Sequence, residues 1–394
     1  MQANLEKLVT ATQKGNWCLV NQCLQQVSWD KKEEFEQVLH SSLQVLRFGD
    51  FRERWEVAKI IPKLGKGVIK PLLSITEDEE TEVEVRWFAV RILGEFNEPE
   101  IIISLVYLMQ ETEEEDLSKI AAATLSNIGN PAIVALSQLL EHEKSRLLAV
   151  KSLSQIRRLS IIKPLISVVD DINPEIRAIA IEGLGSFHEE RLIPIFIQGL
   201  QDIAAAVRKE AVIALGMRGK LKAKFNLVPQ LQPLLYDLNL EVCQQSAIAL
   251  GRMKDDKAVE ALFRVLSART TPILLKKEII RVLSWNGSQK ALGYLEEILY
   301  AEDIEPYQEE ISQEIVTVLG NQELPQLRFQ SAQILINFLN SQQETASTSK
   351  IRQAIAGSLG ELRETSALPS LEQLASDSEK VVRLHAIAGL KKLN

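Results

Sequence analysis

Histidines, cysteines and possible nucleophiles are the residues of this 394-residue chain that could do chemistry, and their spacing is unpromising. Three cysteines, Cys18, Cys23 and Cys243, match neither a disulfide framework nor a metal site. Two of the four histidines, His142 and His188, precede a glutamate, but the two pairs lie far apart in the sequence. A phosphate-binding glycine loop, a nucleophile elbow and a Cys/His pairing are all missing from the sequence. We therefore expect neither a catalytic residue nor a metal site.

Composition and charge narrow the function further. The formal net charge of −8 favours solubility and argues against a nucleic-acid partner. Hydrophobic residues make up 46% of the chain and aromatic residues only 5%, which predicts a core of Leu, Ile, Ala and Val. No apolar run approaches the roughly 18 residues of a membrane span, and the N-terminus does not resemble a signal peptide. These features, with few and odd-numbered cysteines, lead us to expect a cytoplasmic protein.

A ten-residue pattern recurs along the chain. It indicates which helices are repeated and therefore where the other residues lie. It consists of an apolar residue, Arg, two variable residues, a small residue, three variable residues, Leu and Gly. It reads VRWFAVRILG at Val85–Gly94, IRAIAIEGLG at Ile176–Gly185, VRKEAVIALG at Val207–Gly216 and IRQAIAGSLG at Ile351–Gly360. With degenerate copies between them, the first ending at Gly65, the pattern returns roughly every 30 residues, which is the mark of a repeat protein.

Each copy predicts the second helix of a two-helix unit. In the first copy, Val85, Ala89 and Leu93 fall on one helical face, and Ala allows close helix approach. Apolar segments such as Ile161–Val169 precede the copies and predict the first helices, with a polar turn between the two. The closing Gly predicts a left-handed C-terminal cap.

This pattern resembles the HEAT repeats. The resemblance implies an all-α fold, a right-handed α-solenoid of about 11 two-helix repeats. Residues 1–50 depart from the pattern and are expected to form an N-terminal helical cap of three helices. Residues 51–394 are then the repeat array, a single elongated domain. The sequence predicts one long helix between Gly320 and Ser341, but it leaves open whether 321–350 is a full repeat.

An arginine recurs directly after the polar turn of most repeats. We expect these side chains to reach acids or carbonyl groups of neighbouring turns and to form a structural ladder rather than a ligand-binding row. The series is Arg86, Arg146, Arg177, Arg208, Arg352 and Arg383.

Charged runs mark two edges of the predicted array. Two acidic runs, Glu77–Glu84 and Glu111–Asp116, fall in the turns of adjacent repeats and should merge into one acidic ridge. The ridge is either a solvated edge or a docking surface for a basic partner, where charge steers the encounter. Its candidate partner-binding residues are Glu77, Asp78, Glu79, Glu80, Glu113, Glu114 and Glu115. A basic loop with Arg218, Lys220, Lys222 and Lys224 belongs to the other edge. We interpret it as an ordinary loop, with a contact to a phosphate or an acidic partner as the alternative, and it is a weak nucleic-acid signal.

The scarce aromatic residues gather in the first two repeats. Trp87 and Arg91 are spaced to share a helical face, and an exposed Trp beside Arg is a common binding hot spot. The alternative is that Trp87 packs between repeats. Trp55 and Phe88 complete the group, and Trp285, in a segment expected to be a loop, is a possible second contact.

The stretch EVRWFAVRILGEF at Glu84–Phe96 resembles the start of the E/F-type subunits of the cyanobacterial phycobilisome (bilin) lyases. That resemblance covers 13 residues and implies a cyanobacterial protein that holds a bilin or a phycobiliprotein subunit on its concave face. By this resemblance, the residues that bind the partner would be Arg86, Trp87, Phe88 and Arg91. The two His–Glu pairs resemble the HEAT-type deoxyhypusine hydroxylases, which use four such motifs for two irons. The two found here follow a first and a second helix, on opposite edges.

These observations predict a protein–protein interaction scaffold or assembly factor that binds a client protein on its concave surface and carries no cofactor. The alternative is a phycobilin lyase, with bilin as its cofactor and a phycobiliprotein subunit as its partner. A third class, a chaperone for iron–sulfur or photosystem assembly, has only Cys18 and Cys23 in its favour. The sequence does not identify the client, the oligomeric state or the curvature of the array.

Overall fold

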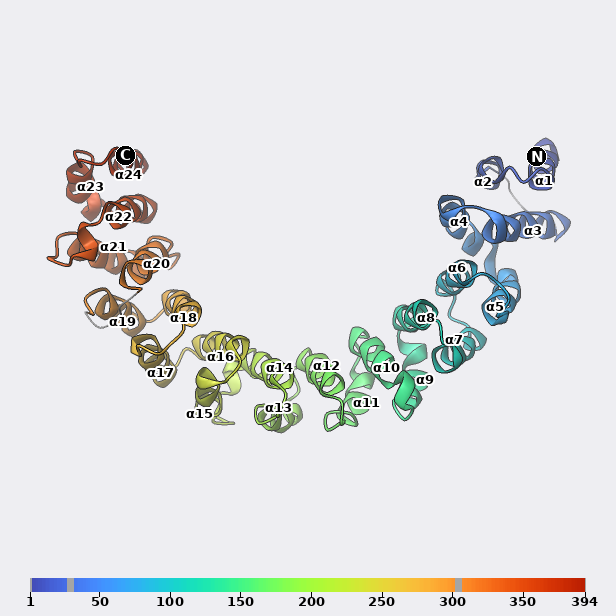
Figure 1. The fold of residues 1–394 in the computed structure, drawn as a ribbon, viewed down its shortest axis with the longest axis horizontal. Coiled ribbons are helices and arrows are strands. Elements are labelled where there is room, and N and C mark those ends of the chain that lie inside the picture. The colour runs from blue at the N-terminus through green and yellow to red at the C-terminus, as the bar shows by residue number, and fades with distance from the viewer. Residues whose placement is uncertain (1, 27–31, 302–306, 394) are drawn as a thin grey trace. The chain divides into compact units, whose positions relative to one another are not determined.

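The computed structural model describes residues 2–26, 32–301 and 307–393, and these residues form α-helices and short 3₁₀ helices. The chain divides into two compact units, Met1–Phe187 (unit 1) and His188–Asn394 (unit 2). Within each unit the helices follow one another as antiparallel pairs (Figure 1). The all-helical, repeated architecture predicted from the sequence is confirmed. Residues Val27–Trp29, the end of the second helix predicted for the cap, lie outside the described residues.

The bounds of the elements in unit 1 are α1 (Gln2–Gln13), α2 (Trp17–Leu24), α3 (Lys32–Phe48), α4 (Phe51–Ala58), η1 (Ile61–Val68), α5 (Ile69–Glu77), α6 (Val83–Leu93), α7 (Pro99–Glu111), α8 (Glu115–Ile128), η2 (Asn130–Ala132), α9 (Ile133–Leu139), α10 (Glu143–Gln155), η3 (Leu159–Ile161), α11 (Ile162–Ile166) and α12 (Pro174–Gly185).

The bounds in unit 2 are η4 (Glu190–Leu192), α13 (Ile193–Gly199), α14 (Ala205–Gly216), η5 (Gly219–Leu221), α15 (Leu227–Leu231), η6 (Gln232–Tyr236), α16 (Leu240–Met253), α17 (Asp256–Ser267), α18 (Ile273–Asn286), α19 (Gln289–Leu299), α20 (Gln308–Gly320), α21 (Pro325–Leu339), η7 (Thr345–Ser347), α22 (Ser349–Leu362), η8 (Thr365–Ala367), α23 (Leu368–Leu374) and α24 (Lys380–Leu393).

The second helices of successive repeats stack on one another. In unit 1, α4, α6, α8, α10 and α12 contact in series and line the inner side of the unit, while α5, α7 and α9 stack on the outer side (Figure 1). The same series runs through α14, α16, α18, α20, α22 and α24 in unit 2. The core lies between the two layers, as the pattern predicts: Val85, Ala89 and Leu93 of α6 are at most 2% exposed. The segment 321–350 supplies α21, which packs as the first helix against α22.

The closing glycines have a different role from the predicted one. Gly94 ends α6 with φ −63°, and Gly216 and Gly360 lie inside α14 and α22, so the predicted left-handed cap is wrong at all three. Gly129 does have a positive φ of +75°, but its ψ of −124° places it outside the left-handed helical region, so it does not form the predicted cap either. At Gly94, Gly216 and Gly360 the neighbouring helix leaves no room for a side chain. A Cβ on Gly360 would stand 2.6 Å from the Cα of Gly389.

Two further predictions need correction. The first copy of the pattern is not one helix ending at Gly65, because α4 ends at Ala58 and the chain continues as η1, where Pro62 has no amide hydrogen to donate. Trp285 is not in a loop, since α18 continues through it to Asn286, and Gly287 with φ +85° ends the helix. The predicted boundary between cap and array at residue 50 falls between α3 and α4, inside unit 1.

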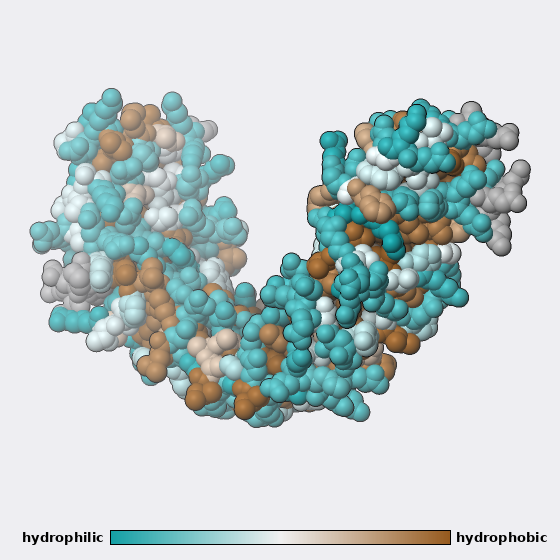
Figure 2. Space-filling view, turned by 45° about the vertical axis from the view of Figure 1, so that its right-hand side comes forward, coloured by the Kyte–Doolittle hydropathy of each residue, from teal (hydrophilic) through white to brown (hydrophobic). Residues whose placement is uncertain are grey.

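The surface of unit 1 is hydrophilic over most of its area, with apolar patches between the charged groups (Figure 2). Among the described residues no single helix has the length and apolar character to span a bilayer. The segments Glu115–Ile128 and Asn130–Leu139 meet that test only when joined, and they bend by 118° at their junction.

Candidate functional site

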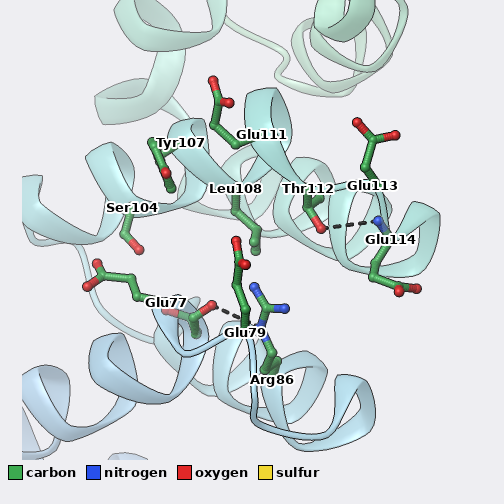
Figure 3. A pocket seen from close by; sticks show the side chains of 11 residues that line it. Glu77, Glu79, Arg86, Ser104, Tyr107, Leu108, Glu111, Thr112, Glu113 and Glu114 are labelled. Carbon is green, nitrogen blue, oxygen red and sulfur yellow. Dashed lines mark hydrogen bonds between the residues drawn. The ribbon is translucent and has the colours of Figure 1, made fainter.

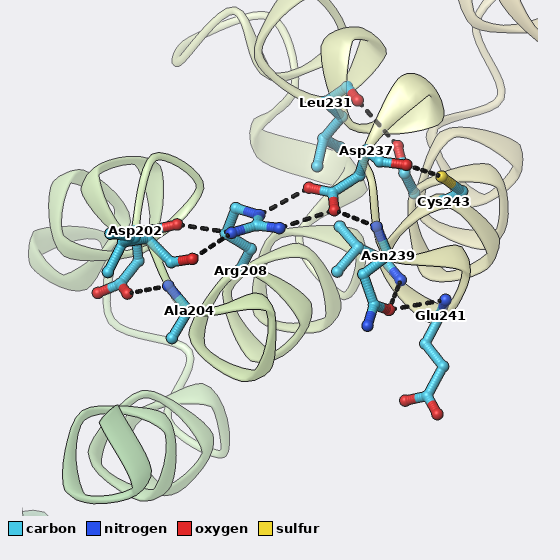
Figure 4. Close-up of polar contacts among 11 residues, drawn as sticks. Asp202, Ala204, Arg208, Leu231, Asp237, Asn239, Glu241 and Cys243 are labelled. Atoms are coloured by element: carbon cyan, nitrogen blue, oxygen red, sulfur yellow. Dashed lines mark hydrogen bonds and ion pairs between the residues drawn. The ribbon is translucent and has the colours of Figure 1, made fainter. Parts of the chain in front are cut away.

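The recurring arginines form the predicted ladder. Arg208, at the start of α14, shows the full set of contacts: one terminal nitrogen donates to the carbonyls of Asp202 and Ile203 in its own turn, at 2.8 and 3.0 Å. Its Nε and other terminal nitrogen bind both carboxylate oxygens of Asp237 in the next turn, at 2.6 and 2.7 Å (Figure 4). This bidentate pair ties one repeat to the next.

The aspartate of each rung also shapes its own turn. Asp237 Oδ1 accepts a hydrogen bond from the amide of Asn239 at 2.8 Å, and the carbonyl of Asp237 accepts one from the Cys243 thiol (Figure 4). Burial raises the pKa of Asp237, but the guanidinium of Arg208 and the Asn239 amide outweigh this effect and lower it overall. The carboxylate is therefore held ionised and bound at neutral pH.

Other rungs repeat this geometry within their own unit. Arg146 meets Asp171 at 3.1 Å, and Arg352 binds Asp377 through two nitrogens at 2.6 and 3.0 Å. Arg54, which the pattern search missed because its repeat is degenerate, pairs with Glu82 at 2.7 Å and with Glu84. The structural role predicted for this row of arginines is thereby confirmed where these contacts are seen.

The rung at Arg86 differs from these, because no acid completes it. Arg86 begins α6, is 7% exposed, and donates from Nε to the Thr76 carbonyl at 3.1 Å. Across the described residues no carboxylate forms an ion pair with it, and neither terminal nitrogen has a hydrogen-bond partner. The residue in the position of the rung aspartate is Thr112, which accepts from the Glu114 amide at 3.2 Å as Asp237 does from Asn239.

The two acidic runs meet around this open rung. The turn after α5 and the turn after α7 border one pocket of about 300 Å³, with Arg86 in its wall (Figure 3). Its remaining lining residues are Thr76, Glu77, Glu79, Ser104, Tyr107, Leu108, Glu111, Thr112, Glu113 and Glu114. The two runs therefore lie side by side, as expected for adjacent repeats.

The other acids of the ridge have local roles. Asp78 accepts from the Thr81 hydroxyl at 2.6 Å and from the Glu80 amide, and these bonds lower its pKa. Glu115 pairs with Lys119 at 2.6 Å, one helical turn along α8. The exposed Glu113 reaches Lys144 at 3.4 Å, a distance that stabilises little at a solvated surface.

A second surface of unit 1 lies on the second helices α4 and α6, the inner side. Arg91 stacks its guanidinium 4.3 Å from the centre of the Trp55 ring and 5.7 Å from that of Trp87. Phe51 is 57% exposed and stacks on Trp55 at 6.2 Å. In the described part of the chain Arg91 has no carboxylate partner. We call Phe51, Trp55, Trp87 and Arg91 the aromatic–arginine cluster.

The predicted site residues thus fall into three settings. Trp55, Trp87 and Arg91 come together at a surface. Phe88 is fully buried beneath them, with its ring edge-on to Trp55 and Trp87 at 6.5 and 5.2 Å, so it supports the cluster from the core. Arg86 and the glutamates lie at the turn edge, apart from the cluster. Their part in partner binding stays a prediction.

The basic loop is occupied by contacts within unit 2. Lys222 donates to the carbonyls of Met253 and Lys254 at 2.7 and 2.9 Å, and Lys224 pairs with Glu190. Arg218 is 4% exposed and lies 4.6 Å from the centre of the Phe196 ring. Only Lys220 points its charge to solvent without a partner among the described residues, which supports the ordinary-loop interpretation.

One surface feature was missed from the sequence. Ile203 and Leu238 follow the turn aspartates Asp202 and Asp237 and are 93% and 104% exposed, at equivalent turns of unit 2. An apolar residue directly after the turn aspartate was the available signal. Ile172 holds the same position in unit 1 and is 93% exposed.

The candidate metal-binding and thiol residues lie apart from one another in the described part of the chain. In residues 2–26, 32–301 and 307–393, no group of three or more His, Cys, Asp or Glu side chains could hold a metal ion. His142 directly precedes α10 without a capping hydrogen bond from its side chain, and His188 follows α12 at the start of unit 2. Cys243 is buried, and burial raises the pKa of its thiol, which disfavours the reactive thiolate.

Known proteins share this architecture. Residues 69–154 and 162–232 match the family model for HEAT repeats. Importin β aligns with a TM-score of 0.59 and 14% identity, over 99% of this chain and 65% of its own. Kap95p, solved with RanGDP, gives 0.54 and 12% over 95% and 58%, and Kap121p, solved with Ste12p, gives 0.53 and 15% over 99% and 53%.

This chain therefore spans between about half and two-thirds of the length of these importins. At such low identity the likeness establishes the fold alone. No curated protein matches the sequence. The stacked helix pairs, the arginine ladder and the family match lead to one conclusion: the protein is an α-solenoid, and its residues 69–154 and 162–232 are HEAT repeats.

Proposed function

We propose that this protein is an interaction scaffold or assembly factor that binds a client protein on the inner, second-helix side of unit 1. The observation that carries the proposal is the aromatic–arginine cluster. Arg91 stands between two indole rings without a carboxylate partner among the described residues, and the Phe51 ring beside them is exposed. Half-buried Trp side chains beside an exposed Arg, supported by a buried ring, are the kind of anchor that dominates protein interfaces.

The comparisons support a protein-binding role without naming the client. Kap121p and Kap95p, two solenoids of similar fold, were solved with the proteins Ste12p and RanGDP. The pocket beside Arg86, and a second depression lined by Lys277, Glu309 and Glu310, are open to the surface and bordered by charged side chains, which fits a macromolecular partner better than an enclosed small molecule.

The test is client capture from a native lysate of the source organism by wild type and by the Trp87→Ala/Arg91→Ala variant. We expect the variant to lose the protein that wild type enriches, by about ten-fold or more in affinity, because both anchors are removed. Trp87 is only partly buried and Arg91 is exposed, so the circular dichroism spectrum and Tm should change little.

A matched control carries the same two residue types elsewhere. On α18 of unit 2, Arg281 is bound to Glu314 at 2.7 Å and Trp285 covers Gly251. The Arg281→Ala/Trp285→Ala variant should capture the client normally, and that result would also remove Trp285 from the candidate contacts. Unchanged capture by the unit 1 variant, or equal loss in both variants, would contradict the assignment to the cluster.

The second candidate is a phycobilin lyase acting on a phycobiliprotein subunit. The observation in its favour is the same Arg91 between two indole rings, since a flat tetrapyrrole bearing carboxylates could stack on Trp and pair with Arg. Co-expression with a bilin source and an apo-phycobiliprotein subunit tests it. Visible absorbance that copurifies with the subunit would support the lyase, and colourless protein would remove it.

A further inference from the structure

The open rung at Arg86 invites comparison with the closed rungs of the same chain. In the closed rungs the acid comes from the turn of the next repeat, as Asp171 does for Arg146 and Asp237 does for Arg208. Thr112 lies as many residues before Ser118 as Asp171 lies before Arg177, and its hydroxyl performs the same turn-capping role. Thr112 has no carboxylate, so the place of the acid beside Arg86 is empty of protein.

The missing acid leaves a buried cation facing a cavity. Arg86 is more than nine-tenths buried, and its two terminal nitrogens have no partner in the described residues while the side chain lines the pocket (Figure 3). The Nε of Arg86 already donates to the Thr76 carbonyl, whereas its terminal nitrogens open onto the pocket. In a largely desolvated site, an acceptor that enters from outside and pairs with those nitrogens gains free energy. The bidentate contact of Arg208 with Asp237 is the template for such an acceptor: a carboxylate.

The rim of the pocket limits what can carry this carboxylate. Five glutamates, Glu77, Glu79, Glu111, Glu113 and Glu114, border the opening, so a free anion meets net repulsion. A carboxylate flanked by positive charges can pair with Arg86 in the wall, while the positive charges pair with the glutamates of the rim. Tyr107, 60% exposed, adds an aromatic surface on which an aliphatic or cationic side chain can rest.

We propose that this pocket binds a basic segment of a partner protein that inserts one aspartate or glutamate side chain toward Arg86, completing from outside the rung that Thr112 leaves open. The lysines or arginines on either side of that acid pair with the glutamates of the rim. This proposal rests on the role of the protein as a scaffold, but it concerns the turn edge rather than the aromatic–arginine cluster.

The probe is a fluorescein-labelled peptide with one aspartate between two lysine pairs, GKKDKKG, and its matched partner GKKNKKG. Titration followed by fluorescence anisotropy at low salt reads the pocket alone and needs no client. We expect the aspartate peptide to bind about ten-fold more tightly than the asparagine peptide, because only the former supplies the charged acceptor. Absent binding of the aspartate peptide, or equal binding of the two, overturns the proposal.

The decisive variant is Thr112→Asp, which closes the rung from within. We expect it to raise Tm by about 2 °C and to weaken the aspartate peptide about ten-fold. The added negative charge would by itself attract the cationic peptide, so weaker binding isolates the filled rung from general electrostatics. Thr112→Asn keeps the turn acceptor without the charge and should bind as wild type does. A Thr112→Asp protein that binds like wild type overturns the proposal, whatever the result of client capture.

Discussion

At the scale of single residues, each recurring arginine that pairs with an acid of the next turn links two neighbouring repeats. Asp237 accepts two hydrogen bonds from Arg208 and one from the Asn239 amide, so the same carboxylate ties the repeats together and shapes the turn. Because its side chain is only 6% exposed, solvent screens the pair weakly. The carboxylate is therefore the single group whose charge matters most at this junction.

Asp237→Asn should lower the free energy of unfolding by about 1–2 kcal/mol at pH 7, since the amide keeps the shape and the turn contact but loses the charge. The pKa of Asp237 is lowered in the folded protein, so its stabilising contribution is present above an unfolded pKa near about 4 and is lost as pH falls through the folded value. The Tm difference between wild type and variant should therefore shrink below about pH 4.

The control is Glu241→Gln, which removes an acid of an exposed pair with Lys209 at 3.2 Å. Its effect on stability should stay below about 1 kcal/mol at every pH. Thermal melts followed by circular dichroism between acid and neutral pH check both variants. A constant Tm difference for Asp237→Asn across that range would show that the charge of the pair contributes nothing.

At the scale of helices, close contact between second helices depends on positions that lack a side chain. Gly360→Ala would place a Cβ 2.6 Å from the Cα of Gly389 in α24, and because the obstacle is backbone, the helices must move apart. We expect a loss of about 1–3 kcal/mol in the free energy of unfolding. The measurement is urea unfolding followed by circular dichroism.

Gly293 in α19 is the matched control, because a Cβ there meets no atom within 4 Å. Gly293→Ala should stabilise the protein by about 0.5–1 kcal/mol, through the better helix propensity of alanine. If Gly360→Ala and Gly293→Ala stabilise the protein equally, the close contact between α22 and α24 does not require glycine at position 360.

The same helices show how far sequence alone could go. The spacing of Val85, Ala89 and Leu93 predicts the buried face of α6 correctly, because the helical period is local and apolar residues at that period mark the face that packs against other helices. The role of Gly360 could not be predicted in this way, since a left-handed cap and a close helix contact both select glycine. Arg86 is the clearest case: its open rung depends on Thr112 in the next repeat, and only the packing of the two repeats brings them into register.

At the scale of the whole molecule, each repeat contacts its neighbours within its own unit, so the stability of a unit is distributed over its repeats. A lesion in such an array should loosen the repeats next to it and leave distant ones unchanged. Ile355, fully buried in α22, offers the test, since Ile355→Ala removes core contacts worth about 2–5 kcal/mol.

Hydrogen exchange measured by mass spectrometry on the intact Ile355→Ala protein reports each helix separately. We expect faster exchange in α20, α22 and α24, which contact one another in series, and wild-type exchange in α4, α6 and α8 of unit 1. Because the aromatic–arginine cluster lies on α4 and α6, this variant should also keep its client binding while unit 2 is loosened. Equally faster exchange throughout the chain would mean that the repeats unfold together as one cooperative body. Unit 1 could then not keep its client binding while unit 2 is destabilised.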